Sequence, residues 1–309
     1  MPNSLPFNMR LPVIAAPMFL VSGPELVIAA CKAGIGGAFP TPNCRTPAEL
    51  DSWMGQITDA LSPDDGPWAA NLITHSTNTG LADDLRLVAE YKPPIVITAL
   101  GSPKPVMETV KAYGGLVFAD VVSIGLAKKA SDAGVDGMAC ISAGAGGHTG
   151  HLNPLAFTSA VRQFFDGYIA VGGGIADGAG IAGAIAAGAD LVYMGTRFLA
   201  ASESRAQDGY KQMVVDSGPD DLVVSAAITG TNASWLRPSL IAAGLDADAL
   251  SSPSARDYTA DKAHKRWKDL WAAGQGLQRI DSVVSTGEIV GRLEREYREA
   301  VQRFNSLAR

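Results

Sequence analysis

The sequence predicts a (β/α)8 barrel, the TIM barrel, followed by a smaller C-terminal helical domain. Between residues 11 and 195, eight short apolar runs alternate with longer stretches of helical periodicity. The runs do not alternate polar with apolar residues, which is typical of parallel strands that helices cover. A doubly wound open sheet is the competing fold, but that fold usually has fewer than eight strands.

The expected strands and helices follow one another in a regular order. Pro24 suits the first position of a helix that ends at Gly34. Thr46 precedes Pro47 and Glu49, which is the pattern of a capped helix start. The expected strands are LPVIAAPM (11–18), GIGGAF (34–39), PWAANLI (67–73), PPIVITAL (93–100), GLVFADV (115–121), VDGMACISA (135–143), YIAVGG (168–173) and DLVYMG (190–195).

The chain beyond the eighth strand divides into two parts. Residues 206–270 are more polar and have the pattern of helices joined by Gly-, Pro- and Ser-rich loops. The last stretch places apolar residues on one helical face, so we expect it to pack back onto the barrel. The expected organisation is therefore a barrel over residues 1–205, a small helical substrate-side domain over 206–270, and a returning C-terminal segment over 271–309.

Composition excludes several classes of partner. The 309 residues carry a net charge of −6, whereas nucleic acids and anionic membranes require a basic face. The three cysteines are widely spaced and form no CxxC pair, so reduced thiols are expected. No uncharged apolar run reaches membrane-spanning length. We expect a soluble cytoplasmic protein with no nucleic-acid or membrane partner, and the sequence leaves a homo-oligomer open.

Two glycine-rich loops predict a phosphate site. In a barrel of this kind, the loops after the strands form the active face, and those after strands 7 and 8 commonly bind phosphate. Glycine lets backbone N–H groups approach the phosphate oxygens closely. The alternative is that these glycines only end a strand tightly. The candidates in "VGGGIADG" and "YMGTRF" are Gly172, Gly173, Gly174, Gly195 and Thr196.

A literal GxGxxG motif at Gly178, Gly180 and Gly183 has a different interpretation. A dinucleotide fingerprint needs its first glycine at the turn between a strand and a helix of an early βαβ unit. This motif begins several residues after the seventh expected strand. We therefore expect it to lie within a helix and to permit close helix packing.

His148 is the candidate catalytic residue. It follows Gly146 and Gly147 in "SAGAGGHTGHLNP", the loop after the sixth expected strand. Flanking glycines allow a flat ligand to approach the backbone and let the imidazole project into the barrel mouth. An imidazole can serve as a base, an acid or an anion partner near neutral pH. His151 could instead orient the loop, and the sequence leaves its role open.

Other catalytic classes lack their signatures. The chain has no HExxH or paired Cys/His spacing, so no metal is expected, and it has no GxSxG nucleophile elbow. Asp120 ends the fifth expected strand, whereas Asp136 precedes the sixth. These acids should therefore lie at opposite ends of the barrel, which disfavours a glycosidase with two carboxylates.

Several motifs, in order along the chain, resemble the FMN-dependent nitronate monooxygenase family. They are "APM" on the first strand, "NL" on the third, "AGGHTG", "GGIADG" and "YMGTRF" after the sixth, seventh and eighth, and then "RPSL" and "WAAGQG". The same signature is similar to that of flavin-dependent enoyl-thioester reductases and NADH:quinone reductases. Some relatives have "QGGM" where this chain has "AAPM", and some carry a basic residue where this chain has "FADV". The resemblance therefore does not fix the surroundings of the flavin ring.

The resemblance implies an FMN-binding barrel and an enzyme. Its activity would be oxidation of alkyl nitronates by O2 to carbonyl compounds and nitrite, with a small-molecule substrate and O2 as partners. The alternative is NAD(P)H-dependent reduction of an enoyl thioester or a quinone. A third possibility is a flavin-binding protein without turnover, or a barrel that binds a different phosphorylated ligand. Carried onto this sequence, the implied roles are catalysis for His148, ring contact for Pro17 and Met18, a polar contact for Asn71, close approach for Gly146 and Gly147, phosphate binding for Gly172, Gly173, Gly174, Gly195 and Thr196, and a return to the pocket for Gln275.

Overall fold

The computed structural model describes residues 6–248, 250 and 267–307. Eight parallel strands close into a barrel, which confirms the expected (β/α)8 fold and rules out the open sheet. Each of the eight apolar runs coincides with one strand, and β2 extends one residue beyond its run, to Pro40. In barrel order they are β1 (Val13–Ala15), β2 (Gly36–Pro40), β3 (Trp68–Ile73), β4 (Ile95–Ala99), β5 (Leu116–Val121), β6 (Gly137–Ile141), β8 (Tyr168–Gly172) and β9 (Leu191–Met194).

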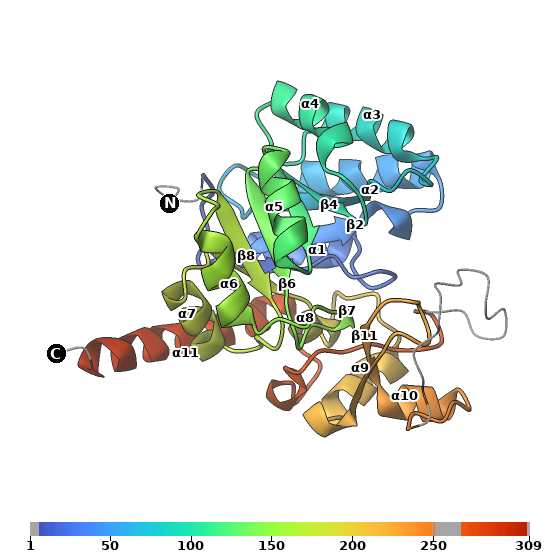
Figure 1. Cartoon of the computed structure of the whole chain (residues 1–309), viewed down its shortest axis with the longest axis vertical. Coiled ribbons are helices and arrows are strands. Elements are labelled where there is room, and N and C mark those ends of the chain that lie inside the picture. The colour runs from blue at the N-terminus through green and yellow to red at the C-terminus, as the bar shows by residue number, and fades with distance from the viewer. Residues whose placement is uncertain (1–5, 249, 251–266, 308–309) are drawn as a thin grey trace.

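A helix follows each barrel strand (Figure 1). The predicted helix starts are confirmed: Pro24 begins the first helix, and the Thr46 hydroxyl accepts a hydrogen bond from the Glu49 N–H at 3.2 Å. These helices are α1 (Pro24–Lys32), α2 (Pro47–Ala60), α3 (Leu81–Tyr91), α4 (Lys104–Ala112), α5 (Ile124–Asp132), α6 (Pro154–Arg162), α7 (Gly178–Ala186) and α8 (Thr196–Leu199).

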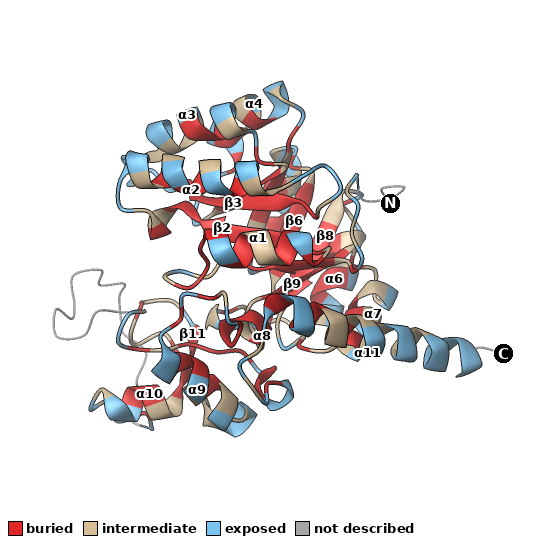
Figure 2. Cartoon of the chain, turned by 180° about the vertical axis from the view of Figure 1, so that it is seen from behind, coloured by how far each residue is buried: buried red, intermediate tan, exposed pale blue. Residues whose placement is uncertain are grey.

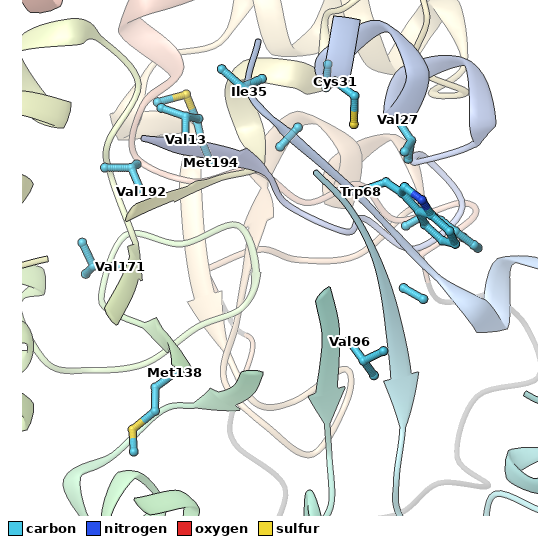
Figure 3. Packing of buried hydrophobic residues seen from close by; sticks show 14 of the residues in the cluster. Val13, Val27, Cys31, Ile35, Trp68, Val96, Met138, Val171, Val192 and Met194 are labelled. Carbon is cyan, nitrogen blue, oxygen red and sulfur yellow. The ribbon is translucent and has the colours of Figure 1, made fainter. Parts of the chain in front are cut away.

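The barrel strands are largely buried (Figure 2), and their alternate residues belong to two separate buried layers. The outer layer packs against the helices; Figure 3 shows Val13 and Val192 from neighbouring strands in the same layer as Val27 of α1. The inner layer fills the barrel and takes residues from every strand. Its buried members are Ile14, Ala16, Ala38, Ala69, Ile95, Ile97, Phe118, Ala139, Ala170, Leu191 and Tyr193.

The chain after the barrel contains helices and also two strands. Its elements are α9 (Asp208–Asp216), β10 (Leu222–Ser225), β11 (Ala233–Leu236) and α10 (Arg237–Ala242). The loop after β6 adds a short strand, β7 (Gly147–His148), which pairs antiparallel with β11. The resulting sheet has the order β10-β11-β7, and Figure 1 shows β7 beside β11. The loop that holds His148 is therefore hydrogen-bonded to the segment that we expect to be purely helical.

The last helix, α11 (Thr286–Leu307), returns to the barrel and packs along α7 (Figure 1). The GxGxxG motif lies inside α7, as expected. At Gly178 a Cβ atom would lie 2.1 Å from the Tyr297 nitrogen and 2.5 Å from the Leu293 oxygen. The first glycine of the motif therefore lets two helices touch. None of the described helices combines the length and apolar character that crossing a bilayer requires.

Gly178→Ala should destabilise the protein by about 1–3 kcal/mol, because the added methyl group would push α11 away from α7. The measurement is the free energy of unfolding in urea. Gly183→Ala is the matched control, since Gly183 lies in the same helix with no atom within 4 Å of its Cβ position. That change should raise the free energy of unfolding by up to about 1 kcal/mol. Equal unfolding midpoints for the two variants would contradict the close packing.

Candidate active site

Three loops and the C-terminal segment meet at the mouth of the barrel. The Gly144 carbonyl, after β6, accepts hydrogen bonds from the N–H groups of Gly174 at 3.0 Å and Gln275 at 2.9 Å. The Gly274 N–H donates to the Thr196 hydroxyl, after β9, at 2.8 Å. These bonds bring segments far apart in the sequence into one cradle, and Gln275 does return to the barrel.

Within this cradle, Gly173 and Gly174 have backbone conformations that other residues rarely adopt. Their φ angles are +138° and +69°. At Gly173 a Cβ atom would lie 2.5 Å from the Ala143 oxygen, so no side chain fits between the two loops. At Gly174 two Gln275 side-chain atoms, both at 3.8 Å, are the only atoms of the described chain within 4 Å of the Cβ position, apart from Gly174 itself and its chain neighbours. The space between the Gly174 backbone and the Gln275 side chain would thus hold a Cβ atom at ordinary van der Waals distance.

Gly172 and Gly146 are glycines because they contact other backbone segments. A Cβ atom at Gly172 would lie 2.7 Å from the Tyr193 oxygen, and one at Gly146 would lie 2.7 Å from the Gly274 nitrogen. Gly147 has a φ of +67° and lies against the Trp267 ring, whose nearest atom is 3.5 Å from the Cβ position. At the two glycines before His148 we expect the flavin to approach the backbone closely. In the structure, other segments of the chain lie close to these glycines.

His148 lies on β7, opposite Ala233 of β11, and its side chain is exposed. The imidazole meets the Trp267 ring edge-on, with ring centroids 5.2 Å apart and planes at 79°. Trp267 in turn packs on Trp235 at 4.6 Å. The Thr149 hydroxyl closes the base of the loop by donating to the Ser142 oxygen at 3.1 Å. A hydrogen-bonded strand and an aromatic pair thus position the histidine.

Met18 lies where β1 and β9 end. Its sulfur is 3.6 Å from the Cβ position of Gly195, and its N–H donates to the Ser22 hydroxyl at 2.9 Å. The Asn43 side chain donates to the Met18 oxygen at 3.2 Å. Met18 and Pro17 both keep partial exposure. The turn after β1 is therefore held in place while it leaves an apolar side chain beside Gly195.

Asn71 points into the barrel from β3, two residues after Ala69 of the inner layer. Its side chain is nearly buried, and its Nδ2 donates to the Ile97 oxygen on β4 at 3.3 Å. This bond orients the amide, because one N–H is used within the barrel wall. Among the described residues no hydrogen bond to the amide oxygen is found, so this oxygen is available to another partner.

Asp120 and Tyr193 each have a buried side-chain oxygen without a hydrogen-bond partner among the described residues. These atoms are the Asp120 Oδ1 and the Tyr193 hydroxyl. Burial raises the pKa of Asp120 from 3.8 to about 7. Burial, and then the Asp120 charge, raise the pKa of Tyr193 well above its ordinary value. Because Asp120 holds its proton more tightly in the folded chain, its contribution to stability is complete below about pH 4 and is lost as the pH rises to about 7.

Asp136 lies at the other end of the barrel, as expected. Its Oδ2 accepts a hydrogen bond from the Val117 N–H at the start of β5 at 2.7 Å, and it forms an ion pair with Lys111. Over the part of the chain that the structure describes, no three His, Cys, Asp or Glu side chains gather closely enough to hold a metal ion. The mouth therefore offers backbone amides, a hydroxyl, a carboxamide and a buried acid.

The chain matches one known enzyme family over most of its length. A sequence model of nitronate monooxygenases matches residues 73–296, which is well over half of the chain. The chain belongs to the nitronate monooxygenase family. It is therefore an oxidoreductase, and the matched range contains the loops after β6, β8 and β9 together with Gln275.

Three individual relatives share 30% sequence identity or less with this chain. A nitronate monooxygenase of Paraburkholderia phytofirmans is 28% identical over 96% of this chain and 95% of its own length. A Rhodococcus jostii enzyme named (3aS,4S,5R,7aS)-5-hydroxy-7a-methyl-1-oxo-octahydro-1H-indene-4-carboxyl-CoA dehydrogenase is 30% identical over 71% of this chain, but the match spans only 60% of that enzyme. The structure of a nitroalkane oxidase from Streptomyces ansochromogenes superposes with a TM-score of 0.81 at 22% identity, covering 96% of this chain and 98% of the other. That last likeness supports the fold.

The sequence interpretation missed Trp235, Trp267 and Tyr193 as members of the mouth. A pattern could have indicated Tyr193, because it lies two residues after Leu191 and so shares the inward face of β9. No sequence signal indicates that Trp267 lies beside His148, because that contact joins segments more than a hundred residues apart.

Proposed function

We propose that the chain is an FMN-dependent nitronate monooxygenase, which oxidises alkyl nitronates with O2 to carbonyl compounds and nitrite. The observation that carries this proposal is the convergence of the loops after β6, β8 and β9 with Gln275, at the barrel end where the His148 loop lies. Family membership supplies the reaction class.

The cradle suits the phosphate of FMN. Glycine backbone without side chains can approach phosphate oxygens, and hydroxyl and carboxamide groups can donate to them. FMN has a single phosphate, which one cradle of this kind can hold. The residues proposed to hold the phosphate are Gly172, Gly173, Gly174, Gly195, Thr196 and Gln275.

The remaining site residues would orient the ring and the substrate. Met18 and Pro17 offer an apolar surface, and Asn71 offers an amide oxygen to the polar edge of the ring. Bound FMN would supply the electron transfer between substrate and O2. His148 would bind the nitronate oxygens as an imidazolium, or take the α-proton from a neutral nitroalkane at a ring nitrogen.

The competing function is NAD(P)H-dependent reduction of an enoyl thioester or a quinone. The Rhodococcus relative carries a CoA ester in its name, so a thioester substrate is a real alternative for this chain. In that reaction His148 would donate a hydrogen bond or a proton to the substrate carbonyl.

Anaerobic mixing experiments separate the two functions. We expect the FMN-loaded protein to lose its visible flavin absorbance when mixed with an alkyl nitronate, and to change little with NADH or NADPH. Rapid bleaching by NAD(P)H without a response to nitronate would overturn the proposal in favour of the reductase. A flavin that responds to neither reductant would indicate a binding protein, and failure to bind FMN at all would remove both enzyme functions.

A further inference from the structure

The pairing of β7 with β11 fixes the backbone of His148 but not the orientation of its ring. His148 lies opposite Ala233, so its Cα position is set by the small sheet. Its side chain is exposed and still rotates about two torsions. A catalytic group must be held close to one geometry, because a small displacement lowers the rate by a large factor. The imidazole therefore needs a contact that the strand does not supply.

The Trp267 indole lies where it can orient that imidazole. The two ring centroids are 5.2 Å apart and the ring planes are at 79°, which is the edge-to-face arrangement that aromatic pairs favour. The same indole lies against Gly147, with its nearest atom 3.5 Å from the Cβ position of that glycine. Trp267 thus packs against both residues of β7, and its contact with the His148 ring restricts the rotation of that ring.

Trp267 is in turn held by Trp235 of β11. The two indole centroids are 4.6 Å apart, and Trp235 is completely buried. Trp235 lies two residues after Ala233, so strand alternation places it on the same face of the small sheet as His148. Trp267 also has a φ of +67°, a conformation that a large side chain keeps only where its surroundings enforce it. The indole is therefore a fixed surface rather than a loose neighbour of the histidine.

The partial exposure of Trp267 distinguishes it from a residue that only fills the core of the small domain. Trp235 serves that core and is completely buried, whereas Trp267 packs on the edge of the same cluster, beside the exposed imidazole. We propose that Trp267 is a positioning residue for nitronate oxidation, whose indole holds the His148 ring in the orientation that presents a ring nitrogen to the substrate. This inference rests on the proposed function and extends it to a residue outside the motifs that carry the family resemblance.

The first test is the NMR spectrum of the protein with isotope-labelled histidine. The sequence has four histidines, and His148→Ala identifies the signals of the His148 ring. The ring current of the indole should shift these signals away from those of a freely exposed histidine. Trp267→Leu keeps an apolar side chain on Trp235 but removes the ring, so it should return the signals toward the exposed values. Unchanged His148 signals in this variant would overturn the inference.

Trp271→Leu is the matched control for the NMR test. Trp271 follows in the same segment, but it stacks on Tyr210 with ring centroids 5.1 Å apart and belongs to a different core cluster from Trp267. Its replacement should leave the His148 signals at their wild-type positions. A shift as large as that in Trp267→Leu would show that the signals report a general disturbance, and would overturn the inference.

The second test is turnover of an alkyl nitronate. Trp267→Leu should lower kcat by about 10-fold to 100-fold. Trp267→Phe keeps an aromatic ring, so its kcat should stay within about threefold of the wild type. In a His148→Ala background, Trp267→Leu should change kcat by less than about twofold, because a residue that acts through His148 has no further effect once that side chain is removed. The Kd for FMN should stay within about twofold of the wild type in both Trp267 variants.

Three results would overturn this inference while leaving the proposed function intact. They are equal kcat losses in Trp267→Leu and Trp267→Phe, an equal effect of Trp267→Leu with and without the His148 imidazole, and loss of FMN binding in Trp267→Leu. The last result would show that Trp267 supports the fold of the mouth instead of orienting the histidine. A wild-type protein that does not oxidise nitronates would remove the proposed function, and this inference with it.

Discussion

His148→Ala should lose nitronate turnover by about 100-fold to 10,000-fold and still bind FMN. The imidazole is the charged or basic group that we assign to the substrate. The His148 backbone is held by pairing with Ala233, so removal of the side chain leaves β7 in place. The measurements are kcat with an alkyl nitronate and the flavin content of the purified variant.

The control for this change is His151→Ala. His151 is exposed, lies three residues further along the same loop, and has no hydrogen bond or ion pair in the described chain. Its replacement should leave kcat within about threefold of the wild type. Wild-type activity in His148→Ala would return His148 to a structural role beside Trp267, and a flavin-free His148→Ala variant would show that the loop itself had collapsed.

Gly173→Ala should weaken FMN binding by about 100-fold, which corresponds to about 3 kcal/mol. The Gly173 φ of +138° is a conformation that is almost confined to glycine. The new methyl group would also lie 2.5 Å from the Ala143 oxygen, so the loops after β6 and β8 would have to separate. The Kd for FMN, measured by fluorescence quenching, reports this change directly.

Gly134→Ala is the control for Gly173→Ala, because it introduces backbone strain at a glycine outside the cradle. Gly134 has a φ of +79°, but no atom lies within 4 Å of its Cβ position, and it lies in the turn before β6, away from the mouth. This variant should lose about 1–2 kcal/mol of stability and bind FMN as the wild type does. Equal FMN affinities for the two variants would argue against a phosphate site at Gly173.

Much of the architecture follows from short-range patterns. The eight buried runs and the capped helix starts are local features, and the barrel confirms them. The position of Gln275 was indicated only by its motif, because its contact with Gly144 depends on the path of more than a hundred intervening residues. The small sheet was missed for a related reason. β7 has only two residues and β11 only four, so neither has a periodicity that a sequence pattern can show.

In the candidate site, too, some features could be predicted from local sequence patterns and others depend on contacts between distant segments. The glycines after two neighbouring strands predict a ligand site, and the structure shows that Gly172 and Gly173 also lie in close contact with other backbone segments. The sequence shows Asp120 near the end of its strand, but only the structure shows that its Oδ1 is buried without a partner among the described residues, which distinguishes it from a surface acid. The aromatic partner of His148 comes from beyond the barrel and depends on tertiary packing alone.

The bonds from Gly274 and Gln275 have a consequence for the order in which the protein becomes functional. All eight barrel strands are complete by Met194, yet the cradle closes only when residues 274 and 275 reach Thr196 and Gly144. Contacts so distant along the chain form slowly, because a long loop must close first. During synthesis on the ribosome, a nascent chain could therefore fold its barrel before it can retain a flavin. Flavin retention would then report the arrival of the C-terminal segment rather than the formation of the barrel.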